Sequence, residues 1–300
     1  MIKLRTWISA ARLRTLPLSV AGIITGAAAA NLHQSFDLSI FLLAISTTLG
    51  LQILSNFAND YGDSVKGTDN HERVGPMRAV QSGILTANEM KNGIAITSVI
   101  TLILAGLLIY EAFKYENLLH SSVFLILGVS AIVAAITYTV GRFAYGYRAL
   151  GDIFVFVFFG LLSVLGSYFL FVRTLDNYIL LPAIVVGLLS TAVLNLNNMR
   201  DRESDKRADK ITLAVLLGAT KIKIYHYALI ISGFVFGLIY FVLIGKSWYY
   251  YVPLIAFLPL FKHLIAVKKT TSSPLLDPEL KKVALFTFFF SILYFIISWF

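Results

Sequence analysis

The strongest constraint on this chain is a series of long apolar segments that recurs from one end to the other. A helix that crosses the hydrocarbon core of a bilayer needs about 20 mostly apolar residues. Nine segments approach that length, at roughly 16–33, 38–58, 92–112, 120–140, 151–172, 177–197, 224–244, 247–264 and 282–300. Only 14% of the residues are charged, against about 25% in a typical soluble domain. The sequence therefore predicts an all-α integral membrane bundle of nine transmembrane helices.

The basic residues gather on one side of this predicted bundle. All but three of the 25 Lys and Arg residues lie in the N-terminal segment or in connections on the same side, and the exceptions are Lys114, Arg173 and Lys246. Cytoplasmic loops carry an excess of Lys and Arg, which predicts a cytoplasmic N-terminus in a multi-pass protein of the cell inner (plasma) membrane. The same distribution explains the net charge of +9 without a nucleic-acid partner. The inward connections are also the long polar ones, so we expect the functional site on the cytoplasmic side.

One transmembrane domain is expected over residues 1–300, with a weak internal repeat. The second and sixth predicted helices each run into a segment rich in Asn and Asp, "NFANDYGD" and "NLNNMRDRESD". Two four-helix pseudo-repeats followed by a ninth helix would account for this pattern. Sites in membrane bundles built from repeats often lie at the repeat interface. The chain contains no cysteine, which excludes disulfides, thiolate nucleophiles and Cys-bound metal sites.

The two acidic segments have helical spacing. In the first, Asn59 and Asp63 are four residues apart and Asp60 and Asp63 are three apart; in the second, Asp201, Asp205 and Asp209 follow at intervals of four. If the helices continue that far, each set lies on one helical face. Carboxylate and amide oxygens are ligands that Mg²⁺ prefers, and Mg²⁺ completes its shell with water and phosphate oxygens. Two facing clusters would hold two Mg²⁺ ions against one diphosphate.

Basic residues near these clusters would neutralise the remaining phosphate charge; they are Lys66, Arg78, Arg142, Arg202 and Lys210. The alternative interpretation is that the carboxylates are solvated loop charges. Two matched clusters at membrane depth argue against it, because charges there are costly and usually functional. Tyr138 and Arg142 are four apart and would share a face at the inner end of the fourth helix. They are either an interfacial pair or part of the substrate site.

At these residues the chain resembles the UbiA-type intramembrane aromatic prenyltransferases. Their two Asp-rich motifs correspond to "NDYGD" at 59–63 and "DRESD" at 201–205. The segments "GPMRAVQSG", "YGYRALGDIFVFVFFG" and "LLDPELKKVALFT" resemble the branch of that family that prenylates 1,4-dihydroxy-2-naphthoate. Two positions depart from the patterns. Gly67 stands where the general motif has its last Asp, and Asp209 replaces a glycine that is usual in the branch.

The resemblance implies an Mg²⁺-dependent transfer of a polyprenyl group from polyprenyl diphosphate to 1,4-dihydroxy-2-naphthoate, with loss of CO₂ and diphosphate, in menaquinone biosynthesis. It implies the catalytic residues Asp60, Asp63, Asp201, Asp205 and Tyr138. The implied metal ligands are Asn59, Asp60, Asp63, Asp69, Asp201 and Asp205. The implied substrate-binding residues are Asn56, Asn59, Lys66, Arg78, Arg142, Asn197, Asn198 and Lys210. Beyond these substrates and the lipid bilayer we predict no protein partner.

Two other functions stay open at this point. One is prenyl transfer to another aromatic acceptor, such as 4-hydroxybenzoate. The other is a cation-coupled secondary transporter that uses its intramembrane acids for coupling. Transporter sites lie near the bilayer midplane, whereas these acids lie at predicted helix ends beside basic residues.

Overall fold

Helices, most of them apolar, make up most of the described part of the chain. The computed structural model describes residues 2–68, 77–114, 117–245, 247–270 and 272–300. Within these ranges the chain has no β-strand, only an isolated bridge between Arg148 and Ile211. Nine helical segments in the described part of the chain are long and apolar enough to cross a membrane. The predicted all-α bundle of nine transmembrane helices is therefore confirmed, while the internal repeat stays a prediction.

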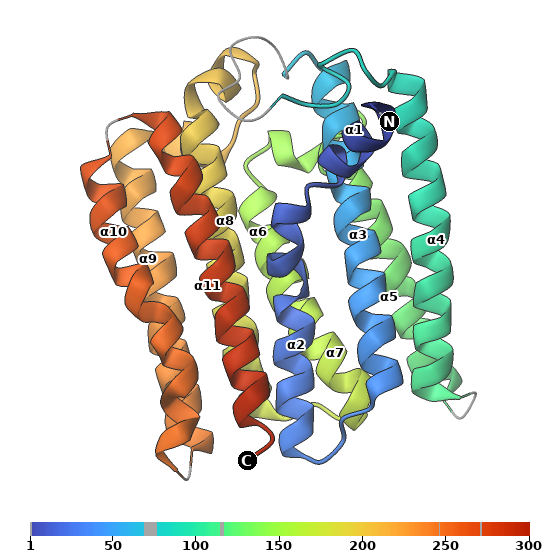
Figure 1. Ribbon diagram of the computed structural model, residues 1–300, viewed down its shortest axis with the longest axis vertical. Helices are drawn as coiled ribbons and strands as arrows, with labels where there is room; N and C mark the ends of the chain where they lie inside the picture. Colours follow the sequence, from blue (N-terminus) through green and yellow to red (C-terminus); the bar gives the residue numbers. More distant parts are fainter. Residues whose placement is uncertain (1, 69–76, 115–116, 246, 271) are drawn as a thin grey trace. The chain divides into compact units, whose positions relative to one another are not determined.

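The helices follow one another in the order shown in Figure 1. They are α1 (Ile2–Ala11), α2 (Leu16–Leu32), α3 (Leu38–Val65), α4 (Ala87–Phe113), α5 (Leu118–Thr137), α6 (Gly151–Val155), α7 (Ser163–Val172), α8 (Leu180–Arg207), α9 (Leu213–Ile244), α10 (Leu258–Lys269) and α11 (Leu276–Ile297). A π-helix over Phe156–Leu162 joins α6 to α7, and a 3₁₀ helix over Trp248–Phe257 leads into α10.

The chain divides into two compact units, each built from three stretches of sequence. The first unit comprises Met1–Leu16, Leu42–Gly151 and Asp201–Leu216, and the second comprises Pro17–Phe41, Asp152–Arg200 and Leu217–Phe300. Both acidic motifs belong to the first unit. The single domain expected over 1–300 stays a prediction.

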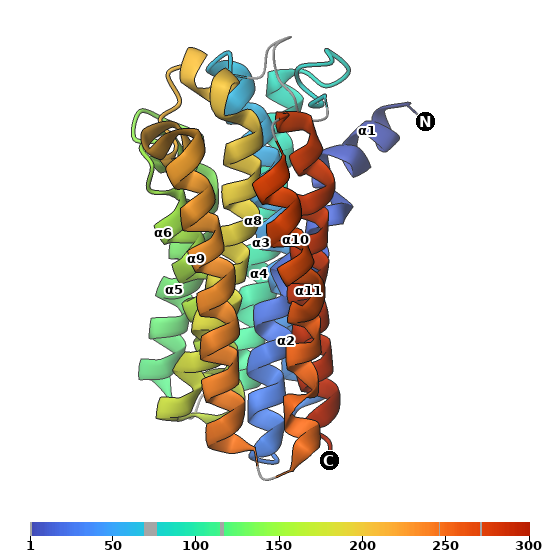
Figure 2. The ribbon, with the colours of Figure 1, turned by 90° about the vertical axis from the view of Figure 1, so that its left-hand side faces the viewer.

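In the first unit, α3 packs through an apolar face. Leu54, Phe57 and Ala58 of this helix are buried together with Leu85 and Met90. Trp7 of α1 packs edge-on against Phe57, with ring centroids 5.1 Å apart. Figure 2 shows α1 inclined to the direction of α3 and α4. The α1 helix therefore braces one end of α3, close to the turn that carries the first acidic motif.

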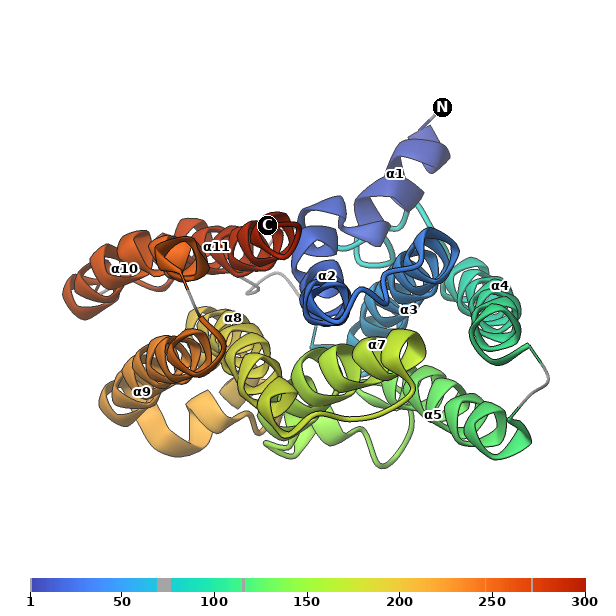
Figure 3. The ribbon, with the colours of Figure 1, turned by 90° about the horizontal axis from the view of Figure 1, so that it is seen from below.

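The α4 helix begins with a complete capping box. The Thr86 side chain accepts a hydrogen bond from the Glu89 backbone N–H, and the Glu89 carboxylate accepts one from the Thr86 backbone N–H. Such reciprocal bonds satisfy donors that a helix start leaves open. Figure 3, an end-on view, shows α4 beside its sequence neighbour α5.

In the second unit, glycines permit close helix packing. A Cβ atom on Gly22 or Gly26 of α2 would lie 2.1 Å from the Ser163 hydroxyl or 2.0 Å from the Ser167 hydroxyl. Small residues at such contacts let helix backbones approach closely inside a bilayer. Gly22 and Gly26 thus serve helix packing.

The observed helix ends change part of the spacing argument. The α3 helix continues to Val65 and α8 to Arg207, beyond the predicted ends at 58 and 197, so both acidic motifs do lie on helices. Asp209, however, follows the end of α8 with a left-handed φ of 52°, so its predicted place on the face of Asp205 is wrong. The prediction that Tyr138 and Arg142 share a helical face is also wrong, because α5 ends at Thr137 and the chain turns before Arg142.

Candidate active site

The last turns of α3 bring Asp60 and Asp63 into two different environments. Both carboxylate oxygens of Asp60 accept backbone hydrogen bonds, from Ala79 N–H at 2.9 Å and Val80 N–H at 3.1 Å. Asp60 is 1% exposed, so it anchors the turn at 77–85 to α3. The role of Asp60 as a metal ligand stays a prediction.

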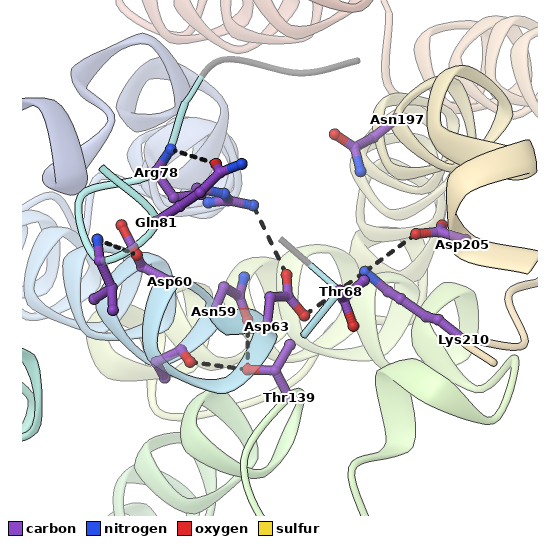
Figure 4. A network of polar contacts seen from close by, with 12 residues as sticks. Asn59, Asp60, Asp63, Thr68, Arg78, Gln81, Thr139, Asn197, Asp205 and Lys210 are labelled. Atoms are coloured by element: carbon purple, nitrogen blue, oxygen red, sulfur yellow. Dashed lines mark hydrogen bonds and ion pairs between the residues drawn. The ribbon is translucent and has the colours of Figure 1, made fainter. Parts of the chain in front are cut away.

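Asp63, by contrast, faces cations. Its Oδ2 lies 3.9 Å from an Arg78 guanidinium nitrogen, and its Oδ1 lies 3.8 Å from the Lys210 ammonium. The Tyr147 hydroxyl donates a hydrogen bond of 2.7 Å to the same Oδ1. Figure 4 shows Arg78 and Lys210 approaching Asp63 from separate segments. The hydrogen bonds from Ala79 and Val80 to Asp60 therefore hold the neighbouring Arg78 close to Asp63.

The second acidic motif meets the first through Lys210. The Lys210 ammonium lies 3.7 Å from Asp205 Oδ1 as well as 3.8 Å from Asp63 Oδ1. The Lys210 backbone N–H bonds back to the Asp205 carbonyl at 2.9 Å, which closes the turn after α8. Figure 4 shows the lysine between the two carboxylates. Asp201 lies one turn before Asp205 on α8 and is also buried.

The charges in this network are shielded from water. The side chains of Asp63 and Asp205 are 6% and 5% exposed, and those of Arg78 and Lys210 are each 12% exposed. Burial of unpaired charges is costly, and pairing compensates for it. A set of alternating charges in such a place is suited to hold a highly charged anion together with its counterions.

The loop after α5 adds a second layer to the site. The Lys66 ammonium lies 4.0 Å from the centre of the Tyr147 ring, and that of Lys210 lies 5.3 Å from it. Partial desolvation is the main cause that lowers the pKa of Lys66. The carboxylate of Asp63 opposes this shift, and the positive charges of Lys210 and Arg148 add to it. The positive charges near Asp63 therefore repel one another and would be stabilised by a bound anion.

The donor set fits a hard divalent cation. No group of three or more His, Asp or Glu side chains forms a protein-only metal centre among the residues whose positions the structure describes. Mg²⁺ usually takes only one or two protein carboxylates and adds water and phosphate oxygens. Asp63 and Asp205 provide such a pair, and the Lys210 ammonium between them marks a position where positive charge is stabilised.

The other predicted residues of α3 are held by the protein itself. The Asn56 amide donates to the Ala11 carbonyl at 2.9 Å, so it ties α3 to the end of α1. The Asn59 carbonyl oxygen accepts a 3.3 Å bond from the Thr139 hydroxyl. Their predicted contacts with metal or diphosphate stay predictions.

The remaining predicted residues are spread more widely. Tyr138 follows α5, and its carbonyl accepts a bond from the Gly146 N–H at 2.9 Å. Arg142 is exposed in the loop beyond. Asn197 and Asn198 belong to the second unit, where Asn197 accepts a 2.9 Å bond from Arg200. Asp69 lies outside the described residues. The roles predicted for all five stay predictions.

Tyr147 and Thr68 are members of the network that the sequence did not predict. Their hydroxyl oxygens are 2.6 Å apart, and Tyr147 also bonds Asp63. Neither residue is acidic, basic or at helical spacing from the motifs. Tyr147 does lie in the segment "YGYRALGD" that carries the resemblance, and this was the only available signal.

Comparison with known proteins identifies the family of this chain. Residues 19–292 match the UbiA prenyltransferase family. The chain is 45% identical over 295 residues to the 1,4-dihydroxy-2-naphthoate octaprenyltransferase of Haemophilus influenzae, covering 97% of this chain and 95% of that one. It is 49% identical over 231 residues to the enzyme of the same name in Escherichia coli, covering 77% and 74% of the two chains. This chain belongs to the UbiA prenyltransferase family, and it is a multi-pass membrane prenyltransferase.

Solved structures share its fold. The apo structure of a UbiA homolog from Aeropyrum pernix K1 superposes with a TM-score of 0.73 at 16% identity, covering 96% of this chain and 99% of that chain. A UbiA homolog from Archaeoglobus fulgidus bound to DMAPP and Mg²⁺ superposes with a TM-score of 0.62 at 14% identity, covering 94% and 98%. The predicted family and fold are confirmed.

Proposed function

We propose that this prenyltransferase transfers a polyprenyl group from polyprenyl diphosphate to 1,4-dihydroxy-2-naphthoate. A carbon–carbon bond forms between the naphthoate ring and the first prenyl carbon, the bond from that carbon to diphosphate breaks, and the carboxyl group leaves as CO₂. The product is demethylmenaquinone in its reduced form. The names of the relatives in Haemophilus influenzae and Escherichia coli support this acceptor.

The observation that carries the proposal is the meeting of the two acidic motifs around one cation. Lys210 lies within 4 Å of a carboxylate from each motif, at 3.8 Å from Asp63 and 3.7 Å from Asp205. Solvated loop charges have no reason to converge in this way from distant parts of the sequence. A diphosphate with its counterions needs such an alternation of acidic and basic groups.

Each basic residue has a role in the departure of diphosphate. Arg78 offers a planar fork that matches phosphate oxygens, while Lys66 and Lys210 act as point charges. Negative charge builds on the diphosphate as its bond to the prenyl carbon breaks. Positive groups that are already in place stabilise that charge without reorganisation. The cation at the prenyl carbon must be protected from water until the ring carbon attacks it.

The carboxylates would hold the metal. Asp63 and Asp205 are the central ligands in this proposal, and Asp60, Asp201 and Asn59 are further ligands. Together they would hold two Mg²⁺ ions in the site. When bound, Mg²⁺ supplies Lewis-acid stabilisation of the leaving diphosphate. The UbiA homolog from Archaeoglobus fulgidus binds DMAPP together with Mg²⁺, which is consistent with this use of the metal.

The site would open to the cytoplasmic side of the plasma membrane. The excess of Lys and Arg in the connections that carry the motifs supports this orientation. The apolar tail of the substrate would then remain in the bilayer while its charged end enters the site from the cytoplasmic side.

The test incubates membranes that contain the protein with 1,4-dihydroxy-2-naphthoate, Mg²⁺ and polyprenyl diphosphates of several lengths. We expect demethylmenaquinol by mass spectrometry, no product with EDTA, and loss of product in Asp201→Asn while the variant still inserts into membranes. A product only with 4-hydroxybenzoate would replace the acceptor. No Mg²⁺-dependent release of diphosphate with any acceptor would refute prenyl transfer and favour a transporter.

A further inference from the structure

Tyr147 joins both kinds of group that the proposed function needs. Its hydroxyl donates to the Asp63 carboxylate at 2.7 Å and lies 2.6 Å from the Thr68 hydroxyl. Its ring lies under two ammonium groups, those of Lys66 at 4.0 Å and Lys210 at 5.3 Å from the ring centre. One side chain thus contacts a predicted metal ligand and two predicted diphosphate-binding lysines.

The backbone fixes the position of this tyrosine. The Gly146 N–H donates to the Tyr138 carbonyl at 2.9 Å, and a Cβ atom on Gly146 would lie 2.7 Å from that oxygen. On the other side of Tyr147, the Ala149 N–H donates to the Ile211 carbonyl at 2.7 Å. The Tyr145–Tyr147 turn is therefore held between the end of α5 and the segment next to Lys210.

Each contact of Tyr147 has a separate physical effect. A hydrogen bond to one oxygen of a ligating carboxylate fixes its rotamer, and loss of such outer bonds typically lowers metal affinity 10–100-fold. An aromatic face attracts ammonium groups, so the ring keeps two mutually repelling lysines near one position. The hydroxyl acts on the metal ligand and the ring acts on the groups that bind diphosphate.

We propose that Tyr147 is a positioning residue that orients Asp63 toward the metal and directs Lys66 and Lys210 toward the diphosphate. This inference rests on the proposed function, since it assigns a task within the same site. Tyr147 itself need not contact the reacting atoms. The effects of the Tyr147 hydroxyl and of its ring can be separated by substitution. Tyr147→Phe removes only the hydroxyl, whereas Tyr147→Leu removes the ring as well.

The test measures binding rather than turnover. Purified full-length protein in lipid nanodiscs is titrated with Mn²⁺ in the presence of inorganic pyrophosphate by electron paramagnetic resonance, and with pyrophosphate at saturating Mg²⁺ by calorimetry. For Tyr147→Phe we expect a Mn²⁺ affinity reduced about 10–100-fold, with little change in the affinity for pyrophosphate. For Tyr147→Leu we expect weaker binding of both.

Tyr145→Phe is the matched control. Tyr145 lies in the same turn, but its hydroxyl donates to the Ala134 carbonyl of α5 at 2.8 Å rather than to a carboxylate. We expect wild-type binding of both ligands in this variant. Equal losses in Tyr145→Phe and Tyr147→Phe would reduce Tyr147 to a general role in holding the turn and overturn the inference.

The two proposals fail in different ways. If the wild-type protein binds Mn²⁺ and pyrophosphate and Tyr147→Phe binds Mn²⁺ equally well, the positioning role is refuted and the proposed function stands. If the wild-type protein binds neither ligand, the proposed function fails and the positioning role fails with it.

Discussion

Asp60 and Asp63 are three residues apart and both are buried, yet they make different contacts and therefore have different roles. Asp60 receives two backbone N–H groups from one turn, whereas Asp63 receives two cations and a phenol hydroxyl. Neutralising the two residues should therefore have different consequences. The distinction is invisible in the spacing of the motif, which treats the two carboxylates alike.

The first prediction compares Asp63→Asn with Asp60→Asn. In Asp63→Asn we expect prenyl transfer to fall at least 100-fold, the scale associated with removing one preorganised electrostatic group. In Asp60→Asn an amide NH₂ would face a backbone N–H, which leaves a buried donor without an acceptor. This should reduce the free energy of unfolding by about 1–3 kcal/mol.

Thermal melting followed by size exclusion and an activity assay on the same preparations check this prediction. Ser64→Ala, which changes a partly buried neighbour of the motif, is the control and should leave both properties close to wild type. Wild-type prenyl transfer in Asp63→Asn, or a wild-type melting temperature in Asp60→Asn, would contradict these different roles.

At the scale of elements, α3 and the end of α5 approach each other at a glycine. A Cβ atom on Gly62 would lie 2.6 Å from the Thr139 hydroxyl, 2.8 Å from its Cβ and 2.9 Å from its backbone carbon. The Thr139 hydroxyl itself donates to the Ala58 carbonyl of α3 at 2.9 Å. The first acidic motif is thus fixed against the segment that leads to Tyr147.

Gly62→Ala is therefore predicted to separate the two elements. Because the clash includes backbone atoms, the neighbour cannot move away by a rotamer change, and we expect a loss of about 1–3 kcal/mol in the free energy of unfolding, typical of overpacking. Prenyl transfer should fall as well. Asp63 follows Gly62 on α3 and Tyr147 follows Thr139 in the chain, so separating Gly62 from Thr139 would also disturb the hydrogen bond between Tyr147 and Asp63. The melting temperature and the prenyl-transfer rate measure these effects.

Gly106→Ala on α4 is the control for that substitution. A Cβ atom there would meet nothing within 4 Å, so the melting temperature should stay unchanged or rise slightly. If Gly62→Ala melted like Gly106→Ala, the close approach of α3 and α5 would not limit stability.

Most of the elements follow from the sequence, because an apolar run of membrane length has few alternatives to a helix. The irregular parts do not follow. Nothing local marks Phe156–Leu162 as a π-helix, and the 3₁₀ helix around Pro253 resembles an ordinary span in hydropathy. Likewise, Asp63 was predictable from its motif, but Tyr147 was not, because its contacts depend on where a loop after α5 meets one after α8.

At the scale of the whole molecule, the distribution of charge makes a prediction about orientation. Basic residues on one side of the predicted bundle outnumber those on the other by 22 to 3, and this asymmetry predicts that the acidic motifs lie on the cytoplasmic side. The chain has no cysteine, so a single introduced cysteine reports on one position without background. Lys114, between α4 and α5, belongs to the poorly charged side, and Lys268, at the end of α10, belongs to the richly charged side.

We expect a membrane-impermeant maleimide to label Lys114→Cys in intact cells and to label Lys268→Cys only after permeabilisation. Both side chains are solvent-exposed, so a difference in labelling reports the side of the membrane rather than burial. Both variants should retain prenyl transfer, since neither position belongs to the proposed site, and the activity assay checks that the labelled protein is folded. The reverse labelling pattern would place the acidic motifs outside the cell. That result would be incompatible with entry of the polyprenyl diphosphate from the cytoplasm and would overturn the proposed orientation.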